Sequence, residues 1–536
     1  METQVTNRAR TGLKGLARLA MPVIMLAGLG ACQEGVDDVD SSGAAQTIEP
    51  QTDGAPEVTV AEGKLQGKLS GTTRTFLGIP YAQAPVGKLR FAAPEPALAW
   101  DGVKQAVAHG PSCPQNPGAL SAPGPQSEDC LSLNVYAPER AAKLPVIVWI
   151  HGGAFVAGGS NQYDGTRLAG EGPVLVVTLN YRLGALGFFA HAGLDATRTA
   201  PSGNDAIRDQ ALALRWVQRN IAAFGGDPDN VTVVGESAGS ASACTHLVSP
   251  ESQSLATRFV LESGSCTGGL PFGTKAKSDA LGDELATALC GDAADKLACL
   301  REKPAAEVVA WGASRGLTGA GWSPIVNAND PVLPASPIAL IKAGKHNRGA
   351  VLLGTNKNEW GLFLAIAPQS PVNSLATFDT QLNAQFGPAS ALIKAHYAPT
   401  EQTANATFVK LMTDGVFRCP TRQLARLTSA QGAKVYLYSF EEGMAFHAFE
   451  IPYVFGNPSP TLAPVLVEPL RKSVQAYWRS FAADGDPNVA GEATWPTYDA
   501  ATDQHLVLKA ASEAGSGLAS SDCDFWDKLS AAAPAP

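Results

Sequence analysis

The sequence predicts an α/β fold in which a central, mostly parallel sheet is flanked by helices. Two apolar runs, residues 144–150 and 174–180, have the length and the continuous hydrophobicity of strands that are buried on both faces. Residues 209–224 follow with apolar side chains at helical spacing, which predicts an amphipathic helix. This alternation of strand and helix is typical of a doubly wound parallel sheet.

A further apolar, β-branched run begins at Val231 and leads directly into the pentapeptide Gly235-Glu-Ser-Ala-Gly239. A strand followed by Gly-x-Ser-x-Gly is typical of a sharp strand-to-helix turn that exposes the serine hydroxyl. Glycine at the outer positions removes side chains that would clash at such a turn. An ordinary tight turn that caps a helix is the alternative. Because a strand precedes the motif, we predict that Ser237 is a nucleophile at the carboxyl end of a central strand.

Two glycines follow the strand at residues 144–150, in the segment His151-Gly-Gly-Ala-Phe155. Without side chains, the backbone N–H groups of Gly152 and Gly153 are free to face a negative charge that develops during a reaction. A plain glycine turn is the alternative. The position after a strand and upstream of Ser237 favours an oxyanion site.

A serine nucleophile requires a base, and the base requires an acid that orients it. In this topology the acid precedes the histidine along the chain. Glu359 lies in the loop after a predicted strand at 350–354, and His447 lies in the loop after another at 435–440. Chain order therefore selects Glu359 as the acid and His447 as the base. Position alone leaves two rivals: Asp330 for the acid and His505 for the base.

Residues 1–31 have the features of an export signal. A basic start precedes an apolar run at residues 19–29, which is too short to span a bilayer. The segment Leu29-Gly-Ala-Cys32 resembles a bacterial lipobox, which implies cleavage before Cys32 and acylation of its thiol. An ordinary signal peptide with an incidental cysteine is the alternative. We therefore expect an exported protein of the bacterial cell envelope, periplasmic or surface-facing, that is anchored to the membrane through Cys32.

The exported part of the chain divides into a tether and a folded body. Residues 32–55 carry six acidic side chains and neither lysine nor arginine, a composition that does not bury enough apolar surface to fold. Residues 56–536 contain no second linker and no internal repeat, so we expect a single large domain.

Charge and cysteine usage narrow the partners. The chain has a formal net charge of −9 at pH 7 and no basic stripe, which argues against nucleic acid. Neither Cys-x-x-Cys nor His-Glu-x-x-His is present, so no metal site is predicted. In an exported protein, cysteines are expected to form disulfides. Eight cysteines remain after Cys32: Cys113, Cys130, Cys244, Cys266, Cys290, Cys299, Cys419 and Cys523.

Several ordered segments together resemble the type-B carboxylesterase/lipase family, the carboxylesterase and cholinesterase group of the α/β hydrolases. The likeness runs from about Val58 to Leu529. It includes the serine pentapeptide, the segment His447-Ala-Phe-Glu-Ile-Pro-Tyr-Val-Phe-Gly456, and three segments upstream of the serine. Those upstream segments are residues 76–82, 128–136 and 224–228.

The resemblance implies the α/β-hydrolase fold, with helical insertions around the active-site entrance. It implies Ser237 as nucleophile, Glu359 as acid and His447 as base, without a cofactor. It further implies an oxyanion hole of three backbone N–H groups, those of Gly152, Gly153 and Ala238.

The resemblance also implies cross-links within the fold. Three disulfides follow from it: Cys113–Cys130, Cys290–Cys299 and Cys419–Cys523. Cys244 and Cys266 fall outside this set, and we hypothesise that they form a fourth bridge. Two buried ion pairs are implied as structural elements: Arg90–Glu128 and Arg182–Asp209.

The predicted function is hydrolysis of a small-molecule carboxylic ester through an acyl-enzyme intermediate. The loop between Cys113 and Cys130 lacks the tryptophan with which cholinesterases hold a quaternary ammonium, so a choline ester is not favoured. Two alternatives remain open: a non-catalytic hydrolase-fold module for binding or adhesion, and a specialised hydrolase of lipids, amides or carbamates. The oligomeric state is not predicted.

Overall fold

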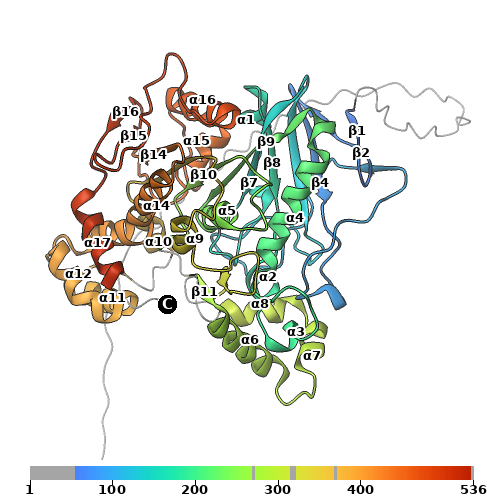
Figure 1. Ribbon diagram of the computed structural model, residues 1–536, viewed down its shortest axis with the longest axis horizontal. Coiled ribbons are helices and arrows are strands. Elements are labelled where there is room, and N and C mark those ends of the chain that lie inside the picture. The colour runs from blue at the N-terminus through green and yellow to red at the C-terminus, as the bar shows by residue number, and fades with distance from the viewer. Residues whose placement is uncertain (1–54, 269–271, 314–320, 367–370, 533–536) are drawn as a thin grey trace, which may run out of the picture. The chain divides into compact units, whose positions relative to one another are not determined.

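An eleven-stranded sheet forms the centre of the molecule, with the strand order β16-β15-β14-β13-β10-β9-β7-β8-β6-β4-β3 (Figure 1). Every neighbouring pair from β15 through β8 is parallel. Antiparallel pairs occur only towards the two edges of this sheet. The arrangement confirms the predicted α/β class with a mostly parallel sheet.

The computed structural model describes residues 55–268, 272–313, 321–366 and 371–532. These residues belong to one compact unit, Gly54–Pro536. The expected export signal, Cys32 and nearly all of the expected tether lie outside the described residues.

The strands that carry the centre of the sheet match the apolar runs of the sequence. They are β7 (Leu144–Ile150), β8 (Leu175–Leu179), β9 (Gly226–Glu236), β10 (Arg258–Glu262), β13 (Ala350–Asn356) and β14 (Val435–Phe440). The outer strands are β3 (Lys68–Ser70), β4 (Thr73–Pro80), β6 (Ser132–Pro138), β15 (His505–Leu508) and β16 (Glu513–Gly515). Two small sheets consist of β1 (Glu57–Val60), β2 (Gly63–Gln66) and β5 (Val103–Gln105), and of β11 (Gly273–Thr274) and β12 (Ile325–Val326).

Helices cover both faces of the sheet, which explains why its strands are continuously apolar. In β7, Val146 and Val148 pack into a core with α4 (Asp205–Asn220) and α5 (Ala238–Val248). The intervening Ile147 and Trp149 pack into a second core with α16 (Glu468–Asp484). Successive side chains of a strand point to opposite faces, so one strand contributes to both cores.

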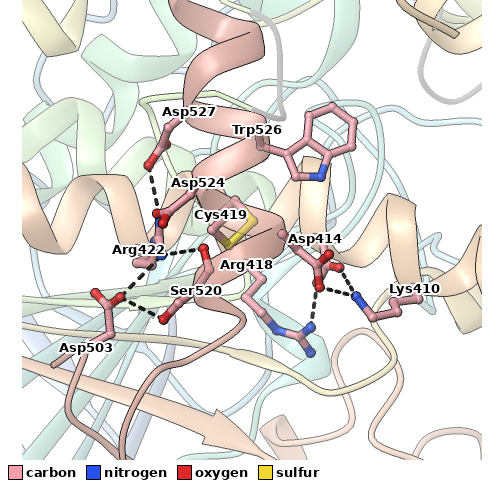
Figure 2. The surroundings of a disulfide bond; sticks show 12 residues. Lys410, Asp414, Arg418, Cys419, Arg422, Asp503, Ser520, Asp524, Trp526 and Asp527 are labelled. Carbon is pink, nitrogen blue, oxygen red and sulfur yellow. Dashed lines mark hydrogen bonds and ion pairs between the residues drawn. A yellow bond between two sulfur atoms is a disulfide. The ribbon is translucent and has the colours of Figure 1, made fainter. Parts of the chain in front are cut away.

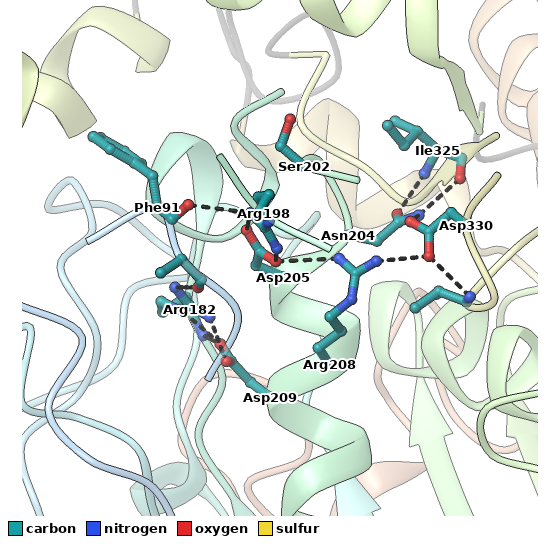
Figure 3. Close-up of polar contacts among 12 residues, drawn as sticks. Phe91, Arg182, Arg198, Ser202, Asn204, Asp205, Arg208, Asp209, Ile325 and Asp330 are labelled. Carbon is teal, nitrogen blue, oxygen red and sulfur yellow. Dashed lines mark hydrogen bonds and ion pairs between the residues drawn. The ribbon is translucent and has the colours of Figure 1, made fainter. Parts of the chain in front are cut away.

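The helix predicted after the second apolar run starts earlier than the sequence indicated. It was predicted at residues 209–224, but α4 begins at Asp205 and a 3-10 turn, Ile221–Phe224, completes it. The first turn of α4 carries Asp205 and Arg208, which are buried through ion pairs (Figure 3). Because these buried positions are charged, the apolar spacing did not reveal them.

The remaining helices form insertions and edges around the sheet. Those before β10 are α1 (Thr166–Gly170), α2 (Gly184–Phe188) and α3 (Ala192–Asp195). Between β10 and β13 lie α6 (Lys275–Cys290), α7 (Lys296–Glu302), α8 (Ala305–Ala313) and α9 (Pro337–Lys342). Between β13 and β14 lie α10 (Trp360–Ile366), α11 (Leu375–Phe386), α12 (Ser390–Tyr397), α13 (Ala404–Met412) and α14 (Cys419–Ala430). The last two are α15 (Ile451–Phe455) and α17 (Ser520–Ala532).

A third hydrophobic core lies within the insertion after β13. It joins Phe378 of α11, Phe408 of α13 and Trp526 of α17. In Figure 1, α17 accordingly runs beside α11 and α12. The insertion and α17 therefore share a core that is separate from the two that cover the sheet.

The structure contains the four expected disulfides and both expected ion pairs. The bridges are Cys113–Cys130, Cys244–Cys266, Cys290–Cys299 and Cys419–Cys523. The pairs are Arg90–Glu128 and Arg182–Asp209, the second with an Nη2–Oδ1 distance of 2.7 Å and a fully buried carboxylate. Within the described ranges, no helix combines the length and the apolarity required to cross a bilayer.

Candidate active site

Ser237 lies at the junction between β9, which ends at Glu236, and α5, which begins at Ala238. Its backbone has a φ of 58°, a left-handed conformation that a non-glycine residue rarely adopts. Its N–H donates to the carbonyl of Glu262 at 3.0 Å, which ties the turn to the neighbouring strand. A Cβ at Gly239 would lie 2.0 Å from the carbonyl oxygen of Ile150, so only glycine fits there. The predicted strand-to-helix turn is therefore present.

The backbone after β7 lies against this turn. A Cβ placed on Gly152 would be 3.0 Å from the Cβ of Ser237 and 2.8 Å from Glu236 Oε2. The N–H of Gly152 points towards the hydroxyl of Tyr163, and the N–H of Gly153 donates to no other described residue. Ala238 is the first residue of α5, so its N–H has no acceptor within that helix. The backbone of Gly152 and that of Ala238 thus lie beside the serine, and Gly153 follows Gly152 in the same loop.

Glu359 and His447 come together from the loops after the adjacent strands β13 and β14. Nδ1 of His447 donates to Glu359 Oε2 at 2.7 Å. The second carboxylate oxygen, Oε1, accepts from the N–H of Asn356 at 2.6 Å. Both side chains are buried. The carboxylate thereby fixes the ring orientation and leaves Nε2 free for another partner.

That second nitrogen faces the end of β9. Nε2 of His447 lies 3.1 Å from Oε1 of Glu236, the residue that precedes Ser237. Burial raises the pKa of Glu236 to about 8. Burial acts in the opposite direction on His447, but the carboxylates of Glu236 and Glu359 outweigh it and raise its pKa to about 9. The two groups therefore titrate as a coupled pair beside the serine.

Two more buried carboxyl groups, Glu262 and Glu450, lie near this pair. Glu450 accepts from Ser263 Oγ at 3.0 Å and from the side-chain amide of Asn356. Glu262 accepts from Nε1 of Trp478 at 2.8 Å. Burial raises the pKa of Glu450 to about 7 and raises that of Glu262 well above its usual range. Because a buried carboxyl group retains its proton more readily, the site need not hold several negative charges at once.

The sequence reasoning did not select Glu262 or Glu450. A signal existed for Glu262, because it ends the apolar strand β10, where a charged residue is unusual. For Glu450 the signal was its place within the histidine segment, three residues after His447. Neither signal separates a residue of the site from one that is buried elsewhere.

Aromatic rings cover the imidazole. The ring centroids of Phe363 and Phe417 lie 5.0 Å and 4.8 Å from that of His447. Trp360 extends this group with a centroid 4.7 Å from that of Phe363. One face of the His447 ring thus lies against apolar rings, a setting in which the hydrogen bond to Glu359 is strengthened.

The two rivals have other partners. Asp330 pairs with Arg208 at 2.6 Å and accepts from Asn204 at 3.0 Å (Figure 3). His505 lies in β15, and its Nδ1 contacts the carbonyl of Asp503 at 3.0 Å. Neither contacts Glu359 or His447 among the described residues. In the same part of the chain, no cluster of three or more histidine, cysteine or acidic side chains could hold a metal ion.

Comparison with known proteins identifies the family. Residues 54–526 match the carboxylesterase family. The chain belongs to the carboxylesterase family. It is 37% identical over 479 residues to a para-nitrobenzyl esterase of Bacillus subtilis. This alignment covers 84% of this chain and 94% of the relative. It is 35% identical to the acylcarnitine hydrolase of Mus musculus and 33% identical to the cocaine esterase of Homo sapiens. These two alignments cover 87% and 89% of this chain and 90% and 92% of the relatives.

Solved structures lead to the same family. A PNB esterase superposes with a TM-score of 0.77 at 34% identity, over 88% of this chain and 99% of that chain. The expected α/β-hydrolase fold is thereby confirmed. As a member of the carboxylesterase family, the protein is a carboxylic ester hydrolase.

Proposed function

We propose that this carboxylesterase acts through Ser237 as nucleophile, His447 as general base and Glu359 as the acid that orients the base. The observation that carries the proposal is the 2.7 Å hydrogen bond from His447 Nδ1 to Glu359. It leaves Nε2 beside the end of β9, at the residue next to Ser237. A serine, a histidine and a carboxylate in this relation form the constellation for acyl transfer.

In the proposed reaction, His447 accepts the proton of Ser237 as its oxygen attacks the ester carbonyl. The carbonyl oxygen becomes negatively charged and accepts hydrogen bonds from the N–H groups of Gly152, Gly153 and Ala238. The bond to the alcohol oxygen then breaks, and His447 donates its proton to the leaving alcohol. Water repeats these steps on the acyl-enzyme, releases the carboxylic acid and regenerates the serine.

Glu236 has an electrostatic role in this scheme. It lies at ion-pair distance from Nε2, so its ionised form stabilises the imidazolium that forms when His447 takes the serine proton. Glu359 stabilises the same cation from the other side of the ring. The positive charge of the intermediate is therefore held between two carboxylates.

We propose small-molecule esters as substrates. The relatives are named for different esters: a para-nitrobenzyl ester, acylcarnitine and cocaine. The three alcohols differ in size and charge, whereas the ester group is common to all. We therefore propose recognition of the ester carbonyl and do not propose a particular alcohol.

The test is the Ser237→Ala variant, assayed with a p-nitrophenyl ester. Loss of the nucleophile should lower kcat by about 10⁴-fold or more, because the remaining groups cannot form the acyl-enzyme. Ser242→Ala is the matched control, since it removes a buried hydroxyl of the same helix that bonds to Gln210 instead. Turnover by Ser237→Ala at the rate of the control would overturn the proposal.

We further propose that a lipid on Cys32 anchors the mature protein to a bacterial membrane. The lipobox-like Leu29-Gly-Ala-Cys32 supports this, as do the four disulfides, which are typical of exported proteins. Cys32→Ser should shift the protein from the membrane fraction to the soluble fraction. A variant that stays in the membrane fraction would contradict the anchor.

A further inference from the structure

A π-helical turn interrupts the long helix that crosses the insertion after β13. Residues Thr413–Arg418 form this segment, called the π turn here, between α13 and α14. A π turn inserts one residue into the helical repeat and so changes the direction of the side chains that follow. Such turns are rare and are frequent at functional sites.

One side of the π turn holds the loop that carries Glu359. The hydroxyl of Thr413 accepts from the N–H of Trp360 at 3.2 Å. The guanidinium of Arg418 donates to the carbonyl of Lys357 at 3.0 Å. Lys357 and Trp360 lie on either side of Glu359 in the sequence, so the two contacts bracket the proposed acid.

The same side of the π turn reaches the proposed base. The ring of Phe417 is 1% exposed and packs against the imidazole of His447, with centroids 4.8 Å apart. Phe363 completes a triangle of rings, 5.9 Å from Phe417 and 5.0 Å from His447. One short turn thus contacts the loop of the proposed acid and the ring of the proposed base.

The opposite side of the π turn is fixed by ion pairs. Asp414 is fully buried in side-chain terms, and it binds Lys410 at 2.7 Å and Arg418 at 2.5 Å. Figure 2 shows Asp414 between these two cations. The hydroxyl of Tyr397 also donates to Asp414, at 3.0 Å. Arg418 also binds the loop that carries Glu359. Asp414 therefore fixes the position of that loop indirectly, through its ion pair with Arg418.

The helix α17 closes this side of the π turn. The disulfide Cys419–Cys523 joins α17 to the first residue after the turn (Figure 2). A Cβ at Gly415 would lie 2.6 Å from the ring of Trp526, so the absence of a side chain permits this contact. Glycine within a helix costs about 0.5–1 kcal/mol relative to alanine, so a specific contact is a physical reason for it.

We propose that the π turn is a positioning element for the catalytic acid–base pair, in which Thr413, Phe417 and Arg418 are the positioning residues. The inference rests on the proposed function, since it concerns the geometry of Glu359 and His447. Thr413, Phe417 and Arg418 contact neither the serine hydroxyl nor the ester in the scheme above. They act by keeping the carboxylate and the imidazole at hydrogen-bond distance while α17 keeps the turn in place.

The experiment compares Thr413→Val with Thr413→Ser and Thr421→Val, using a p-nitrophenyl ester. Thr413→Val removes the acceptor for the Trp360 N–H at nearly constant shape, and we expect kcat to fall about tenfold with KM within about twofold. Thr413→Ser keeps the hydroxyl and should restore kcat. Thr421→Val is the matched control, because its hydroxyl is buried in α14 and has no partner among the described residues.

A second pair of variants tests the ring contact independently. Phe417→Leu removes the ring that packs against His447, whereas Phe408→Leu removes a comparably buried ring of α13 that packs against Phe378. Both variants should lose stability, but only Phe417→Leu should slow the phosphonylation of Ser237 by an organophosphorus reagent, by about tenfold. This readout measures activation of the serine without substrate binding.

The outcomes separate the two proposals. Ser237→Ala that is still active would refute the triad and, with it, the inference. An inactive Ser237→Ala together with wild-type kcat in Thr413→Val and equal phosphonylation rates in the two phenylalanine variants would overturn the positioning role alone. If Thr413→Val does not fold, the comparison of Phe417→Leu with Phe408→Leu decides the inference by itself.

Discussion

The two halves of the active site are held in different ways. Ser237 follows β9 without an intervening residue, and its backbone bonds directly to β10. Glu359 lies three residues beyond β13, and His447 lies seven residues beyond β14. The sheet therefore fixes the proposed nucleophile, whereas the proposed acid and base depend on what packs against their loops.

The supporting contacts reflect the same difference. On the side of the proposed nucleophile, the buried pair Arg182–Asp209 joins the segment after β8 to α4 (Figure 3). On the acid–base side, a disulfide that spans 104 residues and the Asp414 ion pairs join the insertion to α17 (Figure 2). Loss of a supporting contact on the side of Ser237 should therefore lower the unfolding free energy alone. Loss of one on the side of Glu359 and His447 should lower both the unfolding free energy and kcat.

Among the variants that compare the two halves, the largest combined effect on stability and activity is expected from opening the Cys419–Cys523 bridge. The double variant Cys419→Ala/Cys523→Ala should lose about 2–5 kcal/mol of unfolding free energy, because the cross-link no longer restricts the unfolded chain. It should also lower kcat of the folded protein about tenfold, since α17 no longer holds the π turn. Denaturant unfolding and steady-state kinetics at a temperature well below the unfolding transition would measure both.

The matched control lies on the nucleophile side. Asp209→Ala leaves Arg182 buried without its partner and should cost about 3–5 kcal/mol of unfolding free energy. Its kcat per folded molecule should stay within about twofold of the wild type, because the main chain still places Ser237. If Asp209→Ala lowers kcat as much as Cys419→Ala/Cys523→Ala does, the two halves do not differ in how their supporting contacts affect catalysis.

A smaller effect concerns pH. The native pKa values of Glu236 and Glu450 are raised to about 8 and about 7, and that of His447 to about 9. In all three groups the native state binds protons that the unfolded state releases, so the unfolding free energy should fall as pH rises. Glu236 and Glu450 lower the unfolding free energy as the pH rises from about 4.3, the pKa of an unfolded glutamate, to about 8 and about 7 respectively. His447 does so between about pH 6.5 and 9.

Thermal unfolding recorded from pH 5 to 9 would measure this slope. Glu236→Gln removes one of the titrating groups and should flatten the decline below about pH 8. An unchanged slope in this variant would show that Glu236 titrates as it does in the unfolded chain. A flatter slope would show that Glu236 binds a proton in the native state and that the remaining slope comes from the other groups.

Much of the fold was predictable because the central strands are buried on both faces. The runs at 144–150 and 435–440 coincide with β7 and β14 to the residue. The start of β9 was not predictable, since its first residues include Asp227 and Asp229 and lie outside the apolar run. Burial through ion pairs hid the start of α4 for the same reason.

The site divides in a similar way. Chain order and the position after a strand favoured Glu359 and His447 but left two rivals, and the family resemblance favoured the pair that the structure brings together. The π turn and the contact of Phe417 with His447 had no local signal, because both depend on packing between segments that are distant in sequence. Glu450 was hidden because its environment comes from Ser263 and Asn356, each far from it along the chain.

The bridge between Cys419 and Cys523 has a consequence for biosynthesis. A ribosome must add another 104 residues after the first sulfur before its partner exists. Oxidation then requires a compartment that permits disulfides, which the reducing cytosol does not. The newly made chain can consequently form this bridge only after Cys523 has been added and both thiols have left a reducing environment.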